Sequence, residues 1–137
     1  MDGAKSLAVI VQSGGFDHVH YALVMASTAA ATGRRTVLFF TGRALRALAG
    51  PQGWLELDRG DDGTTPASRN AAMRAAGVGD FETLLSACAE LGVRFIACEM
   101  GMRLAGLRHD QLRKDFDIEQ AGMATLLNAA DGPIVHV

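Results

Sequence analysis

A chain of 137 residues, of which 49% are hydrophobic and 20% charged, has the length and composition of one globular domain with a sizeable core. Its formal net charge of -2 provides no broad basic surface for a nucleic-acid backbone. Its longest apolar stretch, residues 21–31, is shorter than the ~20 residues that span a bilayer. We therefore expect a cytoplasmic protein that neither binds nucleic acid nor spans a membrane. Two cysteines without framework spacing fit a reducing compartment.

The first part of the chain alternates between strands and helices. Short apolar runs at residues 6–11 and 36–40 predict strands that are buried on both faces. Between them, the spacing of apolar residues predicts a helix over 19–32, with Asp17 as its cap and Gly33 as its left-handed end. This order of elements is typical of an α/β domain.

A short helix over 43–49 is followed by a long loop. The chain from 50 to 66 is rich in Gly, Asp, Thr and Pro and has no strand or helix period, which predicts a surface loop. Trp54 is expected to pin this loop to the domain, with a clamp on a ligand as the alternative. The acidic residues of the loop do not match an EF-hand, since Arg69 stands where a bidentate Glu is needed.

Two helices and a strand are expected next. Residues 67–76 predict a short helix, and Asp80 is the candidate cap of a clearer one whose apolar stripe includes Cys88. Cys88 is therefore expected in the core. After a glycine turn, the apolar run 93–98 predicts a buried strand that ends on Cys98.

The last part of the chain completes the fold prediction. We expect short helices over 100–104 and 109–113, a last helix over 118–130 and a closing strand over 133–137. Roughly four strands with helices between them favour a single three-layer α/β/α domain with a mainly parallel, flavodoxin-like sheet.

Parallel sheets bind ligands beyond the carboxyl ends of their strands, where residues 13–15, 41–42 and 98–99 are expected to converge. Cys98 ends its strand directly before a helix, where backbone N–H groups and the helix dipole favour a thiolate, the reactive form of cysteine. We interpret Cys98 as the reactive centre, with a buried structural cysteine as the alternative. Strand geometry places Cys88 about 10 Å or more away, so no disulfide is expected.

Two segments of the second half carry a family resemblance. Residues 97–107 (ACEMGMRLAGL) and 120–127 (QAGMATLL) resemble the DsrE/DsrF-like family of sulfur-trafficking proteins. Within that family they are similar to the DsrE2/DsrE3-type branch, whose pattern is A-C-x-M-S-M-x-x-x-G followed by a G-V-A-x-x-L stretch. Residues 11–14 and 39–41 are similar to the family's S-G turn and F-F-T motif. The resemblance covers most of the chain except residues 50–77.

The resemblance implies a three-layer α/β fold, homo-oligomers, and a cysteine that accepts sulfane sulfur as a persulfide and passes it to a partner. Cys98 is then the acceptor, and its partners are sulfur donor and acceptor proteins or small thiols. Two positions depart from the pattern: Gly101 replaces the usual Ser, and Gly42 and Arg43 stand where an aromatic residue often follows the threonine. The implied pocket around the cysteine comprises Ser13, Gly14, Thr41, Met100 and Met102.

The neighbouring charges bear on this assignment. Glu99 disfavours the thiolate unless its carboxylate points to solvent or relays a proton. Arg43 or Arg103 offsets that charge if either lies close, and the alternative for both is a solvated surface.

Two further candidates lie after the first strand. Gly15 extends the turn begun by Gly14, and His18 is a candidate polar wall of the pocket. His18 and His20 are two residues apart on a helix and do not face each other, so a metal site shared with Cys98 is not expected. No cofactor is implied.

Three other function classes stay open as alternatives. A thiol peroxidase is disfavoured, because Phe95 occupies the position three residues before the cysteine where that pattern has Thr. A nucleotide or flavin module rests on Gly14 and Gly15 before a helix, which can cradle phosphate but are also typical of any tight turn. The third alternative is a non-catalytic oligomeric scaffold that binds a small ligand.

Overall fold

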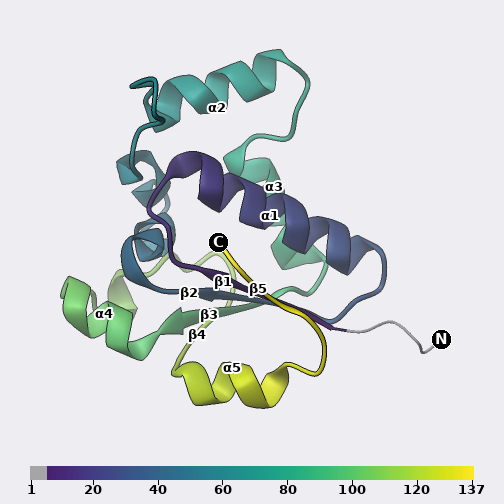
Figure 1. Ribbon diagram of the computed structural model, residues 1–137. Coiled ribbons are helices and arrows are strands. Elements are labelled where there is room, and N and C mark those ends of the chain that lie inside the picture. Colours follow the sequence, from purple (N-terminus) through teal and green to yellow (C-terminus); the bar gives the residue numbers. More distant parts are fainter. Residues whose placement is uncertain (1–5) are drawn as a thin grey trace.

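The centre of the molecule is a five-stranded sheet, seen in a computed structural model that describes residues 6–137 (Figure 1). All strand pairs are parallel, and the order across the sheet is β4-β3-β2-β1-β5. The predicted parallel α/β sheet is therefore confirmed, with one strand more than the roughly four expected. The strands are β1 (Leu7–Val11), β2 (Thr36–Phe40), β3 (Arg94–Cys98), β4 (Ile118–Ala121) and β5 (Ile134–His136).

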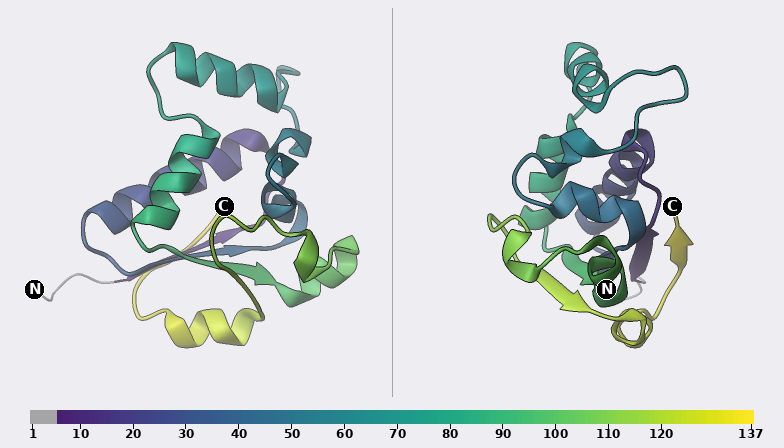
Figure 2. Two further views of the ribbon diagram at one scale, coloured as in Figure 1. Left: turned by 180° about the vertical axis from the view of Figure 1, so that it is seen from behind. Right: turned by 90° about the vertical axis from the view of Figure 1, so that its left-hand side faces the viewer.

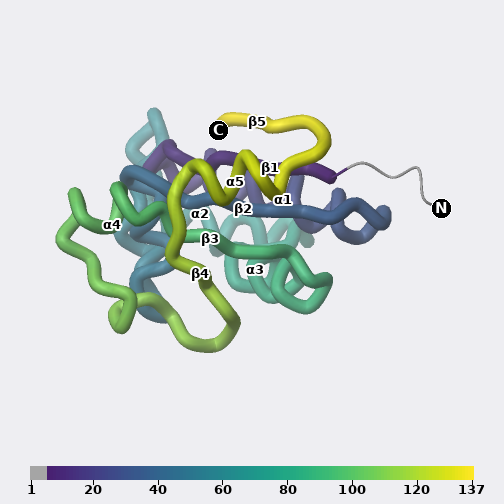
Figure 3. The backbone as a smooth tube through the Cα atoms, turned by 90° about the horizontal axis from the view of Figure 1, so that it is seen from below, coloured from purple at the N-terminus to yellow at the C-terminus, as the bar shows by residue number. Residues whose placement is uncertain are grey.

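The helices are α1 (Phe16–Ala31), α2 (Pro66–Ala75), α3 (Phe81–Glu90), α4 (Glu99–Ala105) and α5 (Met123–Ala129), with 3-10 helices η1 (Gly42–Leu48), η2 (Gly53–Glu56) and η3 (His109–Gln111). α1 and α3 cover one face of the sheet, with α2 beyond them, and α5 covers the other face (Figure 2). α4 projects from the carboxyl end of β3 (Figures 1 and 3). The predicted three-layer architecture is confirmed. Within the described residues, no helix is both long and apolar enough to cross a bilayer.

The inner strands β1, β2 and β3 divide their side chains between two apolar clusters, because successive residues of a strand face opposite sides. The main cluster lies between the sheet and α1, α3 and η1, and it includes Phe95 and Ala97 of β3. A smaller cluster on the α5 face includes Ile96 and Cys98 of the same strand, together with Leu126 of α5. Cys98 therefore faces the thinner side of the sheet, which a single short helix covers.

The predicted last helix over 118–130 is wrong in its first part. Ile118–Ala121 forms β4, which pairs with β3 in register from Phe95↔Ile118 to Cys98↔Ala121, and α5 begins only at Met123. Arg94 donates two hydrogen bonds of 2.7 Å to the Glu119 carboxylate across this pair. Pairing with β3 supplies backbone partners that the local pattern does not reveal, so tertiary contact overrides the local preference.

The two predicted helix caps differ in outcome. Asp17 lies inside the first turn of α1 and Gly15 holds the cap position, so the predicted Asp17 cap is wrong. The Asp17 carboxylate instead accepts a hydrogen bond of 3.0 Å from Arg69. The Asp80 cap is confirmed, since its carboxylate accepts a hydrogen bond of 2.9 Å from the Thr83 N–H at the start of α3.

The segment over residues 50–66 packs onto the domain and contains η2. Trp54 is 8% exposed, and its ring stacks on Phe81 with centroids 5.2 Å apart. Phe16 lies 5.9 Å from the same ring. Trp54 therefore pins the loop to the start of α1 and α3, as expected.

Candidate functional site

β3 carries Cys98 to the carboxyl edge of the sheet, and the next residue, Glu99, begins α4. Cys98 is the N-cap residue of α4, with an extended backbone (φ -65°, ψ 123°). Its Sγ accepts a hydrogen bond of 3.4 Å from the backbone N–H of Gly101. The thiol is free, and the side chain is 6% exposed. The junction thus places the sulfur where backbone amides favour negative charge.

Cys98 lines a cavity of about 760 Å³ at this edge of the sheet. The cavity is built from the ends of β1, β2, β3 and β5 and from the starts of α4 and α5, and its volume is within the range of small-molecule sites. Its walls are mostly apolar, and the residues that line it are Ile10, Gln12, Phe39, Thr41, Cys98, Glu99, Met100, Arg103, Leu104, Gly122, Met123 and His136.

The polar groups of the cavity lie at two sides. On the β1–β5 side, the His136 ring donates a hydrogen bond of 2.7 Å from Nε2 to Gln12 Oε1. On the α4 side, Glu99 and Arg103 are one helical turn apart. Among residues 6–137 neither of these two charged groups forms an ion pair. Both are exposed, so solvent screens the effect of the Glu99 charge on the thiol.

Only some of the sequence-predicted pocket residues lie at this cavity. Thr41, Glu99 and Met100 line it together with Cys98. Met102 is 1% exposed and packs in the main core, on a different face of α4 from Met100. Residues two apart on a helix do not share a face, so the two methionines cannot both form the wall.

Ser13, Gly14, Gly15 and His18 belong to the turn between β1 and α1 and are not among the residues that line the Cys98 cavity. Ser13 Oγ accepts a hydrogen bond of 3.2 Å from the Gly15 N–H. His18 is exposed on the first turn of α1, with its ring against Gly15. This turn is a separate feature of the same sheet edge.

The turn between β1 and α1 is covered by the loop segment at Asp58. The Asp58 N–H donates to the Gly14 carbonyl at 2.7 Å, and the Asp58 carbonyl accepts from the Phe16 N–H at 3.2 Å. A Cβ on Gly14 would lie 2.6 Å from Arg43 Cβ, which explains why glycine is required there. The amides that would cradle a phosphate are thus bonded to protein groups.

Arg43 is held away from Glu99 by the same loop segment. Its guanidinium donates to both carboxylate oxygens of Asp58, with the Nε contact at 3.1 Å, and Arg46 lies 3.5 Å from the same carboxylate. The hydrogen bond from Arg43 lowers the pKa of Asp58, and the same bond raises the pKa of Arg43. Of the two arginines considered as counter-charges for Glu99, Arg103 is the one at the cavity.

Cys88 occupies a different environment from Cys98. It is fully buried on α3, and its Sγ donates to the Leu23 carbonyl at 3.6 Å. Burial raises the pKa of the Cys88 thiol to about 12, so this cysteine stays protonated at neutral pH. The prediction of a core cysteine is confirmed.

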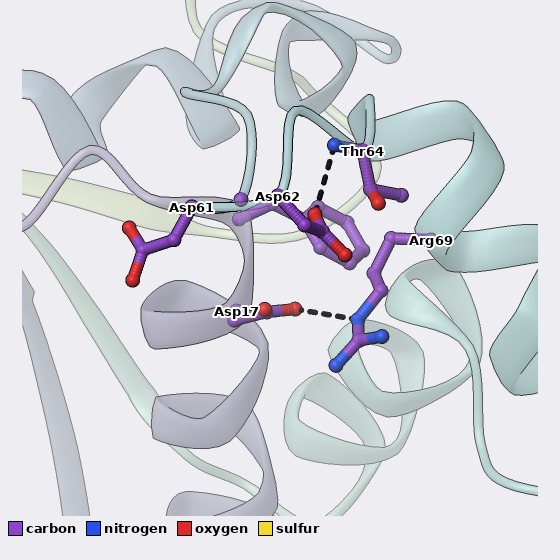
Figure 4. A pocket seen from close by; sticks show the side chains of 7 residues that line it. Asp17, Asp61, Asp62, Thr64 and Arg69 are labelled. Atoms are coloured by element: carbon purple, nitrogen blue, oxygen red, sulfur yellow. Dashed lines mark hydrogen bonds and ion pairs between the residues drawn. The ribbon is translucent and has the colours of Figure 1, made fainter.

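A second hollow, of about 260 Å³, lies between α1 and the end of the 50–66 loop (Figure 4). Its polar groups are bonded to one another: Asp17 accepts from Arg69 at 3.0 Å, and Asp62 Oδ1 accepts from the Thr64 N–H at 3.0 Å. The hydrogen bonds from Thr64 lower the pKa of Asp62. Among the described residues, no three His, Cys, Asp or Glu side chains are grouped so as to hold a metal ion.

Sequence reasoning did not find Gln12 and His136 as cavity residues. Gln12 directly follows the apolar run of β1, so it lies at the same sheet edge as Thr41 and Cys98. Its position in the sequence could therefore have predicted its place at the cavity. His136 reaches the site only because β5 pairs beside β1, with His136 in register with Ile10. No local feature of the sequence specifies that pairing.

A family model described as the DsrE/DsrF/DrsH-like family matches residues 55–135, a stretch that contains β3, Cys98, α4 and α5. The match covers more than half of the sequence, and the chain belongs to this family.

Among individual proteins, the sulfur carrier protein DsrE2 of Allochromatium vinosum is 28% identical over 151 aligned positions, which cover 92% of this chain and 92% of that protein. The uncharacterized protein YrkE of Bacillus subtilis is 28% identical over 155 positions, which cover 97% of this chain and 96% of YrkE.

The fold is also similar to that of MTH1491, a protein of unknown function from Methanobacterium thermoautotrophicum, with a TM-score of 0.62. The similarity covers 97% of this chain and 99% of MTH1491, at 13% sequence identity. At that identity the likeness concerns the fold.

Proposed function

We propose that the protein is a sulfur carrier in which Cys98 accepts sulfane sulfur as a persulfide and passes it to a partner. The observation that carries the proposal is the position of the Cys98 sulfur, which caps α4 and lines the cavity at the sheet edge. Membership of the DsrE/DsrF/DrsH-like family and the full-length similarity to a protein named as a sulfur carrier support it.

The transfer step needs no net oxidation or reduction. The Cys98 thiolate attacks the outer sulfur of a donor persulfide, and a new S–S bond to Cys98 forms as the S–S bond of the donor breaks. The donor leaves as a thiolate and takes up the proton that Cys98 released. The same exchange in reverse, toward an acceptor thiol, unloads the carrier.

The surroundings of Cys98 suit a sulfur anion that must persist between two partners. The Gly101 N–H donates a hydrogen bond to the sulfur, and the amides of the first turn of α4 add positive potential. Apolar walls from Phe39, Met100 and Met123 limit access of water and oxidants. The low exposure of the thiol protects it, while the cavity admits a small thiol or the tip of a partner protein.

Strand geometry favours this role over a thiol peroxidase. The position three residues before Cys98 holds Phe95, whose ring packs in the main core on the opposite face of the sheet. A residue at that position cannot reach the sulfur while β3 is extended. The hydroxyl of Thr41 lines the cavity from the neighbouring strand instead.

We also propose that the protein forms a homo-oligomer and works in the cytoplasm. Apolar side chains that line the cavity are unusually exposed: Met100 by 66%, Leu104 by 82% and Met123 by 41%. A second copy that covered them would bury this surface and enclose the mouth of the cavity. The sulfur donor and acceptor would then reach Cys98 through the part of the cavity mouth that the second copy leaves uncovered.

Sulfur loading of Cys98 variants tests the proposal. Intact-mass measurement after incubation with a persulfide donor should show sulfur-atom increments on the wild type and on Cys88→Ala, with the added atoms on the peptide that contains Cys98. Cys98→Ser should show none. Undiminished loading of Cys98→Ser would overturn the proposed role of this residue.

A further inference from the structure

α4 packs closely against η1 at Gly101, where the side chains of Thr41 and Leu45 lie against the glycine. A Cβ on Gly101 would lie 2.9 Å from Leu45 Cδ1, 2.9 Å from Thr41 Oγ1 and 3.3 Å from the Gly42 nitrogen. Gly101 is buried, and Leu45 is 1% exposed within the main core. A side chain at position 101 would therefore have to displace either a packed core residue or α4 itself.

The residue at this close contact is also the one whose N–H is bonded to the Cys98 sulfur, at 3.4 Å. We infer that Gly101 is a positioning residue for Cys98. The absence of a side chain lets α4 pack closely against η1, and this packing keeps the Gly101 N–H within hydrogen-bond distance of the Cys98 sulfur. The N–H···S distance of 3.4 Å is ordinary for a sulfur acceptor, and a displacement of α4 away from η1 would lengthen or misalign this bond.

Helix energetics argue against the opposite explanation, that glycine is merely tolerated here. Glycine inside a helix is less favourable than alanine because it loses more backbone freedom on folding. If there were room for a side chain at position 101, alanine would stabilise α4 relative to glycine. The three short Cβ distances indicate that close packing, rather than helix propensity, decides this position.

The contact between α4 and η1 includes both places where the sequence departs from the family pattern, Gly101 and Gly42. Gly42 adopts a left-handed backbone, φ +56°, and a Cβ there would lie 3.2 Å from the Gln12 carbonyl oxygen. Gly42 and Gly101 face each other across the contact between η1 and α4. Neither glycine places a side chain into this contact, and α4 therefore lies close over the Thr41 turn.

The inference concerns the thiol of the proposed function, but its test measures alkylation and does not depend on sulfur loading. The rate of Cys98 alkylation by iodoacetamide is measured against pH for the wild type, Gly101→Ala and Gly101→Ser, all in a Cys88→Ala background. Loss of one hydrogen bond to a charged sulfur should raise the midpoint of the rate profile by about one pH unit and lower the rate at neutral pH about tenfold.

Two comparisons separate positioning from a general loss of stability. Ala105→Gly weakens α4 at its exposed last residue and should leave the midpoint unchanged. A background with Thr41→Ala and Leu45→Val removes both side-chain atoms that the new Cβ would meet, and there Gly101→Ala should shift the midpoint much less than in the wild type. Circular dichroism melting verifies that each variant is folded.

Three outcomes would overturn the inference. The first is a wild-type pH profile for Gly101→Ala, and the second is an equal shift in the relieved background. The third is an unfolded Gly101→Ala whose folding the Thr41→Ala and Leu45→Val changes do not restore. A failure of sulfur loading with the alkylation shifts intact would count against the proposed function and leave the role of Gly101 standing.

Discussion

The turn after β1 and the turn after β3 occupy equivalent positions between a strand and a helix, and they differ in what packs over them. Each follows a buried parallel strand and leads directly into a helix. Asp58 covers the Gly14–Gly15 turn with two backbone hydrogen bonds, whereas the Cys98–Glu99 turn opens on a cavity of about 760 Å³. A strand-to-helix turn at the binding edge of a parallel sheet thus becomes available to a ligand only where no other segment packs over it.

The covering segment explains the difference in physical terms. Trp54 inserts between α1 and α3 and brings the chain that follows it across the start of α1. Asp58 then meets Arg43 and Arg46, which extend from η1. The turn after β3 instead lines the cavity, and the helix on that face of the sheet, α5, has only seven residues.

The largest expected effect is a contrast in reactivity between the open turn and the core. In the native protein at neutral pH, iodoacetamide should modify Cys98 at least about 100-fold faster than Cys88, since Cys88 reacts only after local opening. Peptide mapping of timed samples gives both rates. In denaturing urea the two rates should converge, and similar rates in the native protein would remove the contrast.

The next effect compares one glycine in each region. Gly14→Ala should destabilise the protein by about 2 kcal/mol, because the new Cβ would overlap Arg43 Cβ in the closed turn. Gly122→Ala, beside the cavity, would meet only Glu99 Oε1, at 3.7 Å, and should change the free energy of unfolding by less than about 0.5 kcal/mol. Urea unfolding measures both. Equal losses would show that the two regions are packed alike.

A smaller effect is expected from the charge that closes the first turn. The pKa of Asp58 is lowered in the folded state from its ordinary value of 3.8, so its stabilisation is present above that value and is lost as pH falls through the folded pKa. Asp58→Asn should therefore lower the melting temperature at neutral pH, and this effect should shrink as pH falls below 3.8 and through the lower folded pKa.

Thermal melts across this pH range measure the difference between wild type and variant. Asp117→Asn is the matched control, because Asp117 is exposed and forms no ion pair within residues 6–137. A difference for Asp58→Asn that stayed constant with pH would count against the ion pair as its source.

The smallest effect on stability concerns the exposed apolar rim of the open region. Leu104 is 82% exposed, so Leu104→Ser should change the free energy of unfolding of the monomer by less than about 0.5 kcal/mol. If a second copy covers this surface, the same change should shift the protein toward monomer in light scattering. An unchanged oligomer would place the interface elsewhere.

Much of the fold was predictable because the inner strands can be recognised from their own stretches of sequence. β1, β2 and β3 are continuous apolar runs, and such runs indicate strands buried on both faces. Of the two edge strands, β5 was also predicted, within the expected strand over 133–137, but β4 was not. β4 has two adjacent polar residues, Glu119 and Gln120, between two apolar ones and so lacks a strand pattern. Its residues were assigned to a helix because pairing with β3 is a long-range contact.

The candidate site was predictable to a similar degree. Cys98 and Thr41 end the inner strands, so parallel geometry alone brings them to one edge. Ser13, Gly14 and Gly15 end β1 at the same edge, but the packing of Asp58 and Arg43 removes them from the cavity. His136 joins it from β5, a strand whose place in the sheet has no local signal.

By itself, the sequence determined the α/β alternation, the buried inner strands and the placement of one cysteine between a strand and a helix, because these depend on periodicity and on neighbours along the chain. Only the tertiary structure decided which turn stays open, which methionine meets the cavity and why residue 101 is a glycine. Those outcomes depend on contacts between segments far apart in sequence, where a few tenths of an ångström between packed atoms determine what fits.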